Sequence, residues 1–273
     1  KPMFRVIAEQ DDVVVGYGRT CLIAPNARRS FASEVIVHPK AQRQGIGRAV
    51  FKEIERYARE NGAQCTTLVV FDRIADTKPA IERLGYEEKT FYFQSSLDPR
   101  TFDVTEHNGV IARVCESGIQ IRALSEFPAT EQTDRAFHAV VHETELDVPF
   151  LDYFGVLGFD DYRKMMMGAQ WFDRSGAFVA MHGEKIVGVT LVNPGSVDFN
   201  GEMFVSHTGV VDGYRGKGIA TALKARALEW AKAFGGTKVR TENNTANPAM
   251  RAVNQRLGFA DTGGQWLMVK ELA

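Results

Sequence analysis

Residues 212–234, DGYRGKGIATALKARALEWAKAF, carry the pattern that decides the fold of this 273-residue chain. The residues before them, His207 to Val211, have the apolar character of a short strand, and apolar side chains recur at helical spacing from Ala220 to Phe234. A glycine loop that opens into a helix lets the backbone approach an anion and directs the unpaired N–H groups of the first turn toward it. Arg215 and Lys217 add positive charge beside that turn. The pattern therefore predicts a phosphate-binding loop.

A second block follows at a fixed distance. Residues 238–243 have the composition of a strand, and Asn247-x-x-Met-x-x-x-Asn-x-x-Leu-Gly-Phe259 comes after them. Together with the loop, read as Arg215-x-x-Gly-x-Ala220, this block resembles the GNAT superfamily of N-acetyltransferases, whose loop binds acetyl-CoA. Two spaced blocks make the resemblance specific, whereas one alone would leave an unrelated glycine-rich turn as an equal explanation.

The same signature occurs earlier, in Gln42-x-x-Gly-x-Gly47. Gly45 precedes Gly218 by 173 positions, and Leu84-Gly85 precede Leu257-Gly258 by the same 173. A fixed offset through a loop, a helix, a strand and a second helix indicates a long internal repeat of two domains. The length of the chain also favours two domains.

The resemblance implies a mixed α/β (α+β) fold of two tandem GNAT-like domains, organised like the tandem GNAT proteins of the mycothiol synthase type. Each would be a mostly antiparallel twisted sheet with flanking helices and one splayed pair of parallel strands. We expect an N-terminal domain over 1–97, a linker or bridging strand over 98–117, with 110–115 as the candidate strand, and a C-terminal domain over 118–273. The first copy lacks the family's first strand and first two helices, so either the N-terminus was longer or this domain is a reduced copy.

Local patterns predict the remaining elements. Strands are expected at 4–9, 13–22, 31–37, 65–71, 91–96, 119–124, 177–182 and 185–192, and helices at 48–61, 129–143 and 160–171.

Composition limits the partners. The net charge of −1 gives a nucleic-acid role no electrostatic support. Three scattered cysteines fit a reducing cytoplasm, and neither an apolar span of 18 residues nor a signal peptide is found. His138 and His142 have no third ligand at a metal-site spacing. We expect a cytoplasmic monomer or homodimer without a metal, a membrane or a nucleic acid.

In the GNAT family a bulge splays the strand before the loop from its parallel neighbour. This frees a backbone N–H for the thioester oxygen, and the pantetheine arm lies in the gap. The resemblance assigns these roles to Val210 and Val211 for the thioester and arm and to Asn247 for the arm. For the pyrophosphate it implies Arg215, Gly216, Lys217, Gly218, Ile219, Ala220 and Thr221.

The first copy offers a matching set for CoA. Its members are Val37, Gln42, Arg43, Gln44, Gly45, Ile46, Gly47 and Arg48. Ile74 and Ile81 occupy the places of Asn247 and Asn254, and an isoleucine can neither bond the arm nor protonate a thiolate. We therefore expect the first domain to bind CoA but to catalyse poorly, or only to support its neighbour.

Acetyl transfer needs an amine that has lost a proton, and the departing thiolate benefits from an acid. The family's base glutamate is replaced by Phe204. Two residues could act as the base instead, directly or through a water. Glu202 lies two residues before Phe204 on the same strand face, whereas His207 is nearer the expected bulge but on the other face under strict alternation. The family's acid tyrosine is replaced by Asn254, which can orient but cannot protonate. A water or Tyr153 would then act, or no acid is needed.

The resemblance implies an acetyl-CoA-dependent N-acetyltransferase whose C-terminal domain moves the acetyl group directly to a primary amine of a small molecule in a ternary complex. Residues 142–162 are rich in acidic and aromatic side chains, which would suit a cationic acceptor. The alternative is a non-catalytic CoA-binding sensor or scaffold. A transferase of longer acyl groups is a third reading.

Overall fold

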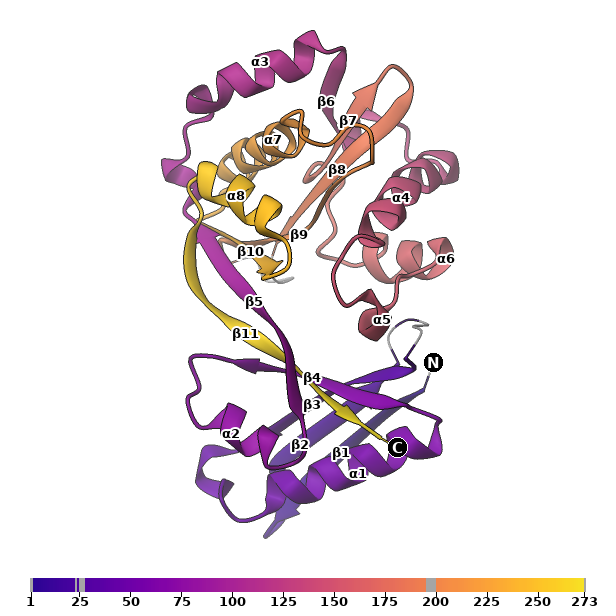
Figure 1. Ribbon diagram of the computed structural model, residues 1–273, viewed down its shortest axis with the longest axis vertical. Helices are drawn as coiled ribbons and strands as arrows, with labels where there is room; N and C mark the ends of the chain where they lie inside the picture. The colour runs from indigo at the N-terminus through magenta and orange to yellow at the C-terminus, as the bar shows by residue number, and fades with distance from the viewer. Residues whose placement is uncertain (1, 23, 25–27, 195–199, 273) are drawn as a thin grey trace. The chain divides into compact units, whose positions relative to one another are not determined.

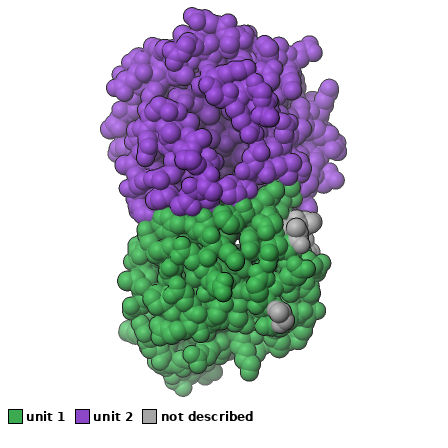
Figure 2. Space-filling view, viewed as in Figure 1, with its two compact units in different colours: residues 1–92, 150–156, 264–273 green, residues 93–149, 157–263 purple. Residues whose placement is uncertain are grey.

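The computed structural model describes residues 2–22, 24, 28–194 and 200–272. The chain divides into two units, shown in Figure 2. Unit 1 comprises Lys1–Tyr92, Phe150–Val156 and Gly264–Ala273, and unit 2 comprises Phe93–Pro149 and Leu157–Gly263.

Unit 1 is a sheet of strand order β1-β2-β3-β4-β11 with a long helix, α1. In chain order its elements are β1 (Met3–Gln10), β2 (Val13–Cys21), β3 (Ser30–Val37), α1 (Ile46–Glu60), β4 (Cys65–Phe71) and α2 (Thr77–Glu82). A 3-10 turn, Pro39–Ala41, precedes α1, and a short helix, α5 (Leu151–Phe154), also belongs to this unit. β3 and β4 run parallel, and the other neighbours are antiparallel.

Unit 2 repeats this arrangement at larger size, with strand order β5-β10-β9-β8-β7-β6. Its strands are β5 (Glu87–Leu97, of which residues 93–97 belong to this unit), β6 (Ile119–Ala123), β7 (Ala177–His182), β8 (Lys185–Pro194), β9 (Glu202–Val210) and β10 (Lys238–Asn244). Its helices are α3 (Asn108–Glu116), α4 (Glu131–Glu145), α6 (Phe159–Tyr162), α7 (Ile219–Ala233) and α8 (Pro248–Arg256). Helices α4 and α7 lie on opposite faces of β8 and β9 (Figure 1). A Cβ added to Gly188 of β8 would meet Leu223 of α7, and one added to Gly209 of β9 would meet Thr144 of α4.

The internal repeat is confirmed by the element bounds. α1 spans 46–60 and α7 spans 219–233, while β4 spans 65–71 and β10 spans 238–244. Both pairs are displaced by the 173 positions that separate Gly45 from Gly218. Equivalent residues of the two copies can therefore be compared one by one.

The last strand of each repeat is exchanged. β11 (Ala260–Glu271) ends in unit 1, where Glu271 to Gln265 pair antiparallel with Cys65 to Phe71 of β4. Residues 93–97 of β5 belong to unit 2, beside β10. Division of the chain at residue 97 does not anticipate this exchange, because nothing local to a strand specifies a partner so far away in the sequence.

Two local expectations were wrong. Residues 110–115 do not form the candidate strand: two 3-10 turns, Pro99–Thr101 and Val104–His107, lead into helix α3. Ile111 and Val114 are buried at a spacing of three while the residues between them are exposed, which is a helical pattern. The helix expected at 160–171 is also shorter, since α6 ends at Tyr162 and continues only as one wide turn, Arg163–Met167.

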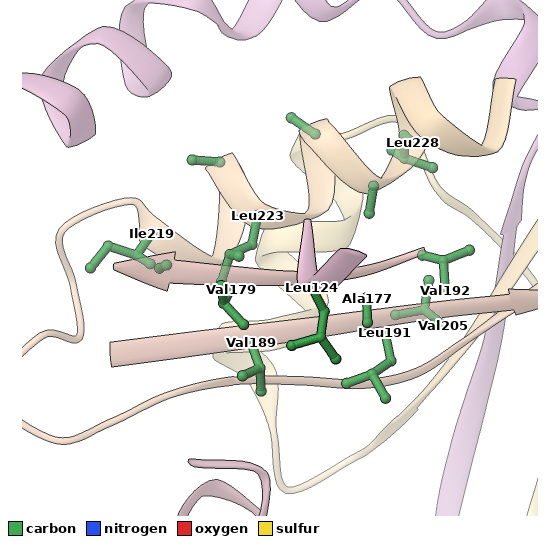
Figure 3. Close-up of a cluster of buried hydrophobic side chains, with 14 of the residues drawn as sticks. Leu124, Ala177, Val179, Val189, Leu191, Val192, Val205, Ile219, Leu223 and Leu228 are labelled. Carbon is green, nitrogen blue, oxygen red and sulfur yellow. The ribbon is translucent and has the colours of Figure 1, made fainter. Parts of the chain in front are cut away.

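Part of the core of unit 2 lies between α7 and the sheet (Figure 3). Ile219, Leu223 and Leu228 of α7 are each about 1% exposed or less and pack in one cluster with Val192 and Val205. Full burial of such a side chain contributes roughly 1.5–3 kcal/mol. This packing fixes where α7 begins, and so it positions the loop before the helix.

Candidate active site

Strands β9 and β10 separate in the direction of the loop. They pair in parallel only from Glu202 and Lys238 to Val205 and Thr241, although β10 continues to Asn244 and β9 to Val210. The cause is a bulge in β9. On β8, Val192 is opposite Val205 and Leu191 is opposite His207, which leaves Ser206 as the extra residue. The splayed pair that the sequence predicted is present in unit 2.

Backbone direction decides which amides face the gap. Val211 N–H donates to Val187 O at 3.0 Å, so Val211 is engaged with β8. Successive residues of a strand alternate in direction, so the amides of Val210 and Thr208 point away from β8, toward the gap beyond Thr241. Of the two amides expected to receive the thioester oxygen, Val210 is suitably directed and Val211 is not. Thr208 was missed, because the sequence does not show which residues bond to β8.

The loop after β9 ends in a cradle of backbone amides. Gly218 has a φ of 85° and is the N-cap of α7, with no side chain capping the helix. The first helical hydrogen bond runs from Ala222 N–H to Gly218 O, so the amides of Ile219, Ala220 and Thr221 have no partner within the helix. Such a helix start attracts phosphate.

The charged side chains of the loop hold its shape. Arg215 Nε donates to Val210 O at 2.9 Å, and its guanidinium forms an ion pair with Asp147. Lys217 Nζ donates to Gly213 O at 2.9 Å. Gly216 adopts a φ of 74° between them. Both cations stand beside the cradle, although the charge of Arg215 is shared with a carboxylate.

His207 lies on a face that strict alternation does not predict. Leu191 is opposite His207 and Asn193 is opposite Phe204, and these two residues of β8 are two apart and share a face. The bulge therefore brings His207 to the face of Phe204 and Glu202, toward α4. There its Nε2 lies 2.8 Å from the hydroxyl of Thr144. Burial, together with the charge of Lys224, lowers the pKa of His207 to about 4, so the imidazole is neutral and a weak base.

Glu202 is at the beginning of β9, in the part that pairs with β10. Its carboxylate forms ion pairs with Arg240 at 3.2 Å and with Lys238 at 3.6 Å. The bulge at Ser206 lies four residues further along the strand. The structure therefore brings Glu202 together with two cations of β10.

The two asparagines of the second block have different roles. Asn247 is the N-cap of α8, and its Oδ1 accepts from Met250 N–H at 3.1 Å. Asn254 is 2% exposed and donates from Nδ2 to Asn243 Oδ1, while its own Oδ1 is buried without a partner. Tyr153, considered as a substitute acid, belongs to unit 1 and packs against Arg28.

Two titratable residues of unit 2 were not singled out by the sequence. Burial raises the pKa of Glu145, the last residue of α4, to about 7. Burial, and to a lesser extent the charge of Glu145, raises the pKa of Tyr162 in α6. Burial lowers the pKa of Lys224 in α7 to about 7. Glu145 was only one of many acidic side chains in its segment, and Lys224 is hidden within a helix.

Unit 1 contains a second cradle. β3 and β4 pair only from Ser30 to Ala32, and Gly45, with a φ of 86°, is the N-cap of α1. The first turn is Ile46, Gly47 and Arg48. The side chains before it bond within unit 1: Gln42 to Val37 O, Gln44 to Lys40 O, and Arg43 to Asp76.

No helix among the described residues is long and apolar enough to cross a membrane.

Comparison with known proteins agrees with this geometry. The sequence model of the acetyltransferase (GNAT) family matches residues 1–86 and 143–259. A mycothiol acetyltransferase of Streptomyces scabiei is 26% identical over 228 residues, which are 84% of this chain and 68% of the relative. A tandem GNAT protein from the clavulanic acid biosynthesis pathway superimposes with a TM-score of 0.73 at 19% identity, covering all of this chain and 83% of the other.

A GCN5-related N-acetyltransferase of Sphaerobacter thermophilus gives a TM-score of 0.71 at 18% identity, over 96% of this chain and 78% of the other. These structures share the fold, and the family match spans well over half of the sequence. The chain therefore belongs to the GNAT family of acetyltransferases and is a tandem member of it.

Proposed function

We propose that this chain transfers an acetyl group from acetyl-CoA to a primary amine of a small molecule, by direct attack in a ternary complex in unit 2. The observation that carries the proposal is the gap between β9 and β10, which leads to the uncapped start of α7. A gap lined by unpaired strand edges suits an extended chain with amide groups, and the cradle suits a diphosphate.

The residues present fit acetyl-CoA. The amides of Ile219, Ala220 and Thr221 would bind the pyrophosphate, with Lys217 beside them, and those of Val210 and Thr208 would bind the arm or the thioester oxygen. Bound there, acetyl-CoA supplies an activated acyl carbon and a thiol leaving group. An N–H aimed at the thioester oxygen stabilises the negative charge that develops as the amine attacks.

Glu145 is our candidate for the group that takes the proton of the acceptor. It follows Thr144, which is bonded to His207 just after the bulge. Its side chain is half-buried, and the loss of solvent raises its pKa to about 7; no described residue forms an ion pair with it. Such a group attracts an ammonium and can accept its proton. Glu202, held by two cations, and His207, with a pKa of about 4, are the weaker candidates.

We infer a cationic amine as the acceptor class. The acidic residues of unit 2 in the segments around α4 and α6 include Glu143, Glu145, Asp160 and Asp161. A negative surface attracts a protonated amine and disfavours an anionic competitor.

The test is release of free thiol from acetyl-CoA with a panel of small primary amines, each alone and with a carboxylate-bearing analogue as control. We expect steady release with at least one cationic amine and retention of the acetyl group on its nitrogen. Tight acetyl-CoA binding without turnover across the panel would instead indicate the non-catalytic alternative. If longer acyl-CoA donors were turned over faster than acetyl-CoA in competition, the donor would be a longer acyl-CoA instead.

A further inference from the structure

A hydrophobic cluster of unit 1 has a polar counterpart in unit 2. In unit 1, one cluster comprises Phe51, Leu68, Val70, Ile81, Tyr86 and Met268. Their equivalents 173 positions away are Lys224, Thr241, Asn243, Asn254, Phe259 and, through the exchanged strand, Ser95. Five of these six positions are polar, and we call those five the polar cluster: Ser95, Lys224, Thr241, Asn243 and Asn254.

The polar cluster is buried as deeply as its apolar counterpart. Its members are between 2% and 8% exposed, and the core residues that they replace are between 0% and 7% exposed. Burying polar groups is unfavourable unless each finds a hydrogen bond. Unit 1 shows that the fold needs only apolar residues here. The substitution therefore indicates a role other than packing.

Two members of the polar cluster each have a polar group that makes no hydrogen bond to a described residue. Lys224 is 2% exposed, and the only contact of its ammonium group among the described residues is with the ring of Phe259, at 5.4 Å from the centroid. Asn254 Oδ1 is buried and accepts nothing. In unit 1 the matching contact is an aromatic pair, Phe51 with Tyr86, at 5.8 Å. A buried ammonium group without an anionic partner is suited to bind an anion that enters the site.

The polar cluster lies at the gap. Asn243 follows Thr241, the last residue of β10 that pairs with β9, and it accepts from Asn254 of α8. α7 packs against both β9 and α8 (Figure 1). Lys224 is close enough to His207, just past the bulge, that its charge lowers the pKa of the imidazole. Among the described residues, His207 is the titratable group coupled to Lys224, and the pKa of Lys224 itself is lowered by burial alone.

We propose that Lys224 carries a proton to the sulfur of CoA as the thiol departs. This rests on the proposed function, because the anion that reaches the gap in acetyl transfer is the thiolate. The place of the family's acid tyrosine is taken by Asn254, a member of the same cluster, which can orient a donor but cannot protonate.

The proton count closes within the site. The amine nitrogen forms a bond to the acyl carbon, the carbon–sulfur bond breaks, and its electron pair stays on sulfur. Lys224 gives one ammonium proton to that sulfur and becomes neutral. A cationic acceptor loses its first proton to Glu145 before it attacks; the new amide nitrogen must then lose a second proton, and the neutral lysine takes that one. No oxidant or further reactant is required, and burial keeps both forms of Lys224 accessible near pH 7.

The test compares Lys224→Met with Lys232→Met, the same change at an exposed position of the same helix. Hydroxylamine serves as the acceptor, so that recognition of a particular amine does not enter. For Lys224→Met we expect kcat to fall about 100-fold, the usual contribution of a general acid, and its pH dependence near 7 to disappear. The Kd of acetyl-CoA, measured by calorimetry, should stay within about twofold of the parent, as it should for Lys232→Met.

A second measurement does not depend on turnover or on the variant. The Lys224 Nζ resonance of the parent protein is titrated by NMR with CoA and with desulfo-CoA, which lacks the thiol. We expect the titration midpoint to rise with CoA and to stay unchanged with desulfo-CoA. Equal midpoints, or a Lys224→Met variant with parental kcat and pH profile, would overturn the role of Lys224 alone. A parent protein that neither binds nor consumes acetyl-CoA would overturn the proposed function and this inference with it.

Discussion

His207 Nε2 lies 2.8 Å from Thr144 Oγ1, which joins strand β9, just after its bulge, to helix α4. The Thr144 hydroxyl also donates to Val140 O at 2.7 Å, so its hydrogen goes to α4 and it accepts from the imidazole. This bond fixes one tautomer of a neutral histidine. It also fixes the distance between the gap and the end of α4, where Glu145 stands.

The first prediction concerns this histidine and acid. The pKa of His207 is about 4 in the folded protein, against about 6.5 when unfolded, so between these values the unfolded chain binds more protons. The free energy of unfolding therefore contains the full contribution of the neutral His207 above about pH 6.5, and it falls by up to about 3 kcal/mol as the pH drops to 4. Urea unfolding at pH 7.5 and 4.5 measures it. His207→Gln should show a smaller drop, and an equal drop would contradict the assignment.

Lys224 should change stability in the alkaline range. Burial lowers its pKa to about 7 in the folded protein, against about 10.5 in the unfolded chain, so the unfolded chain binds the extra proton between these values. Stability should rise with pH from 7 toward 10 by about 3 to 5 kcal/mol, provided that no other group opposes it. Lys224→Met should remove that rise and unfold at higher denaturant at pH 7. A variant less stable than the parent would show that the ammonium has a stabilising partner.

Gly218 and Gly45 form a matched pair for a test of the cradle. They have φ values of 85° and 86°, but an added Cβ would meet Val110 at 2.6 Å in the first case and nothing within 4 Å in the second. Gly45→Ala should lower the free energy of unfolding by about 1 kcal/mol, because alanine is strained at this positive φ. Gly218→Ala should cost at least about 2 kcal/mol, and Val110→Ala in the same chain should recover the difference. Equal losses in thermal unfolding would exclude the contact with α3.

The same two glycines test how many cradles bind CoA. A glutamate at either position places a negative charge where a phosphate would lie. By calorimetry we expect two sites in the parent and one in each of Gly45→Glu and Gly218→Glu. Turnover should survive Gly45→Glu and vanish in Gly218→Glu. Unchanged binding in Gly218→Glu would show that the loop is not the CoA site.

The repeat was predictable because loop, helix and strand recur at one offset, and the structure keeps that offset in α1 with α7 and β4 with β10. The strand face on which His207 lies was not predictable, because a bulge changes the alternation of side chains and has no recognisable pattern in this sequence. The exchanged strands depend on contacts between distant residues. Lys224 could have been found, since the same offset aligns it with Phe51.

Glu145 gives the last prediction, which concerns the acceptor. Its pKa is raised to about 7 by burial, so the folded protein binds more protons than the unfolded chain between about pH 4.5 and 7, and stability falls as the pH rises through that range. Glu145→Gln should remove this loss of stability, so at pH 8 the variant should have a higher free energy of unfolding than the parent. If Glu145 takes the proton of the amine, kcat/KM of the parent rises as the pH approaches 7 and falls above 7, where Lys224 loses its proton; Glu145→Gln should lose about 100-fold together with the rising limb.

Glu143→Gln, a neighbouring exposed carboxylate of α4, is the control for charge alone. It should lower attraction of a cationic amine only modestly and leave the pH profile in place. Because the two variants remove the same charge two residues apart, a shared loss of activity would assign a general electrostatic role to this end of α4. A loss of activity confined to Glu145→Gln, together with its gain in stability, would show that this half-buried carboxylate serves the reaction and lowers the stability of the fold.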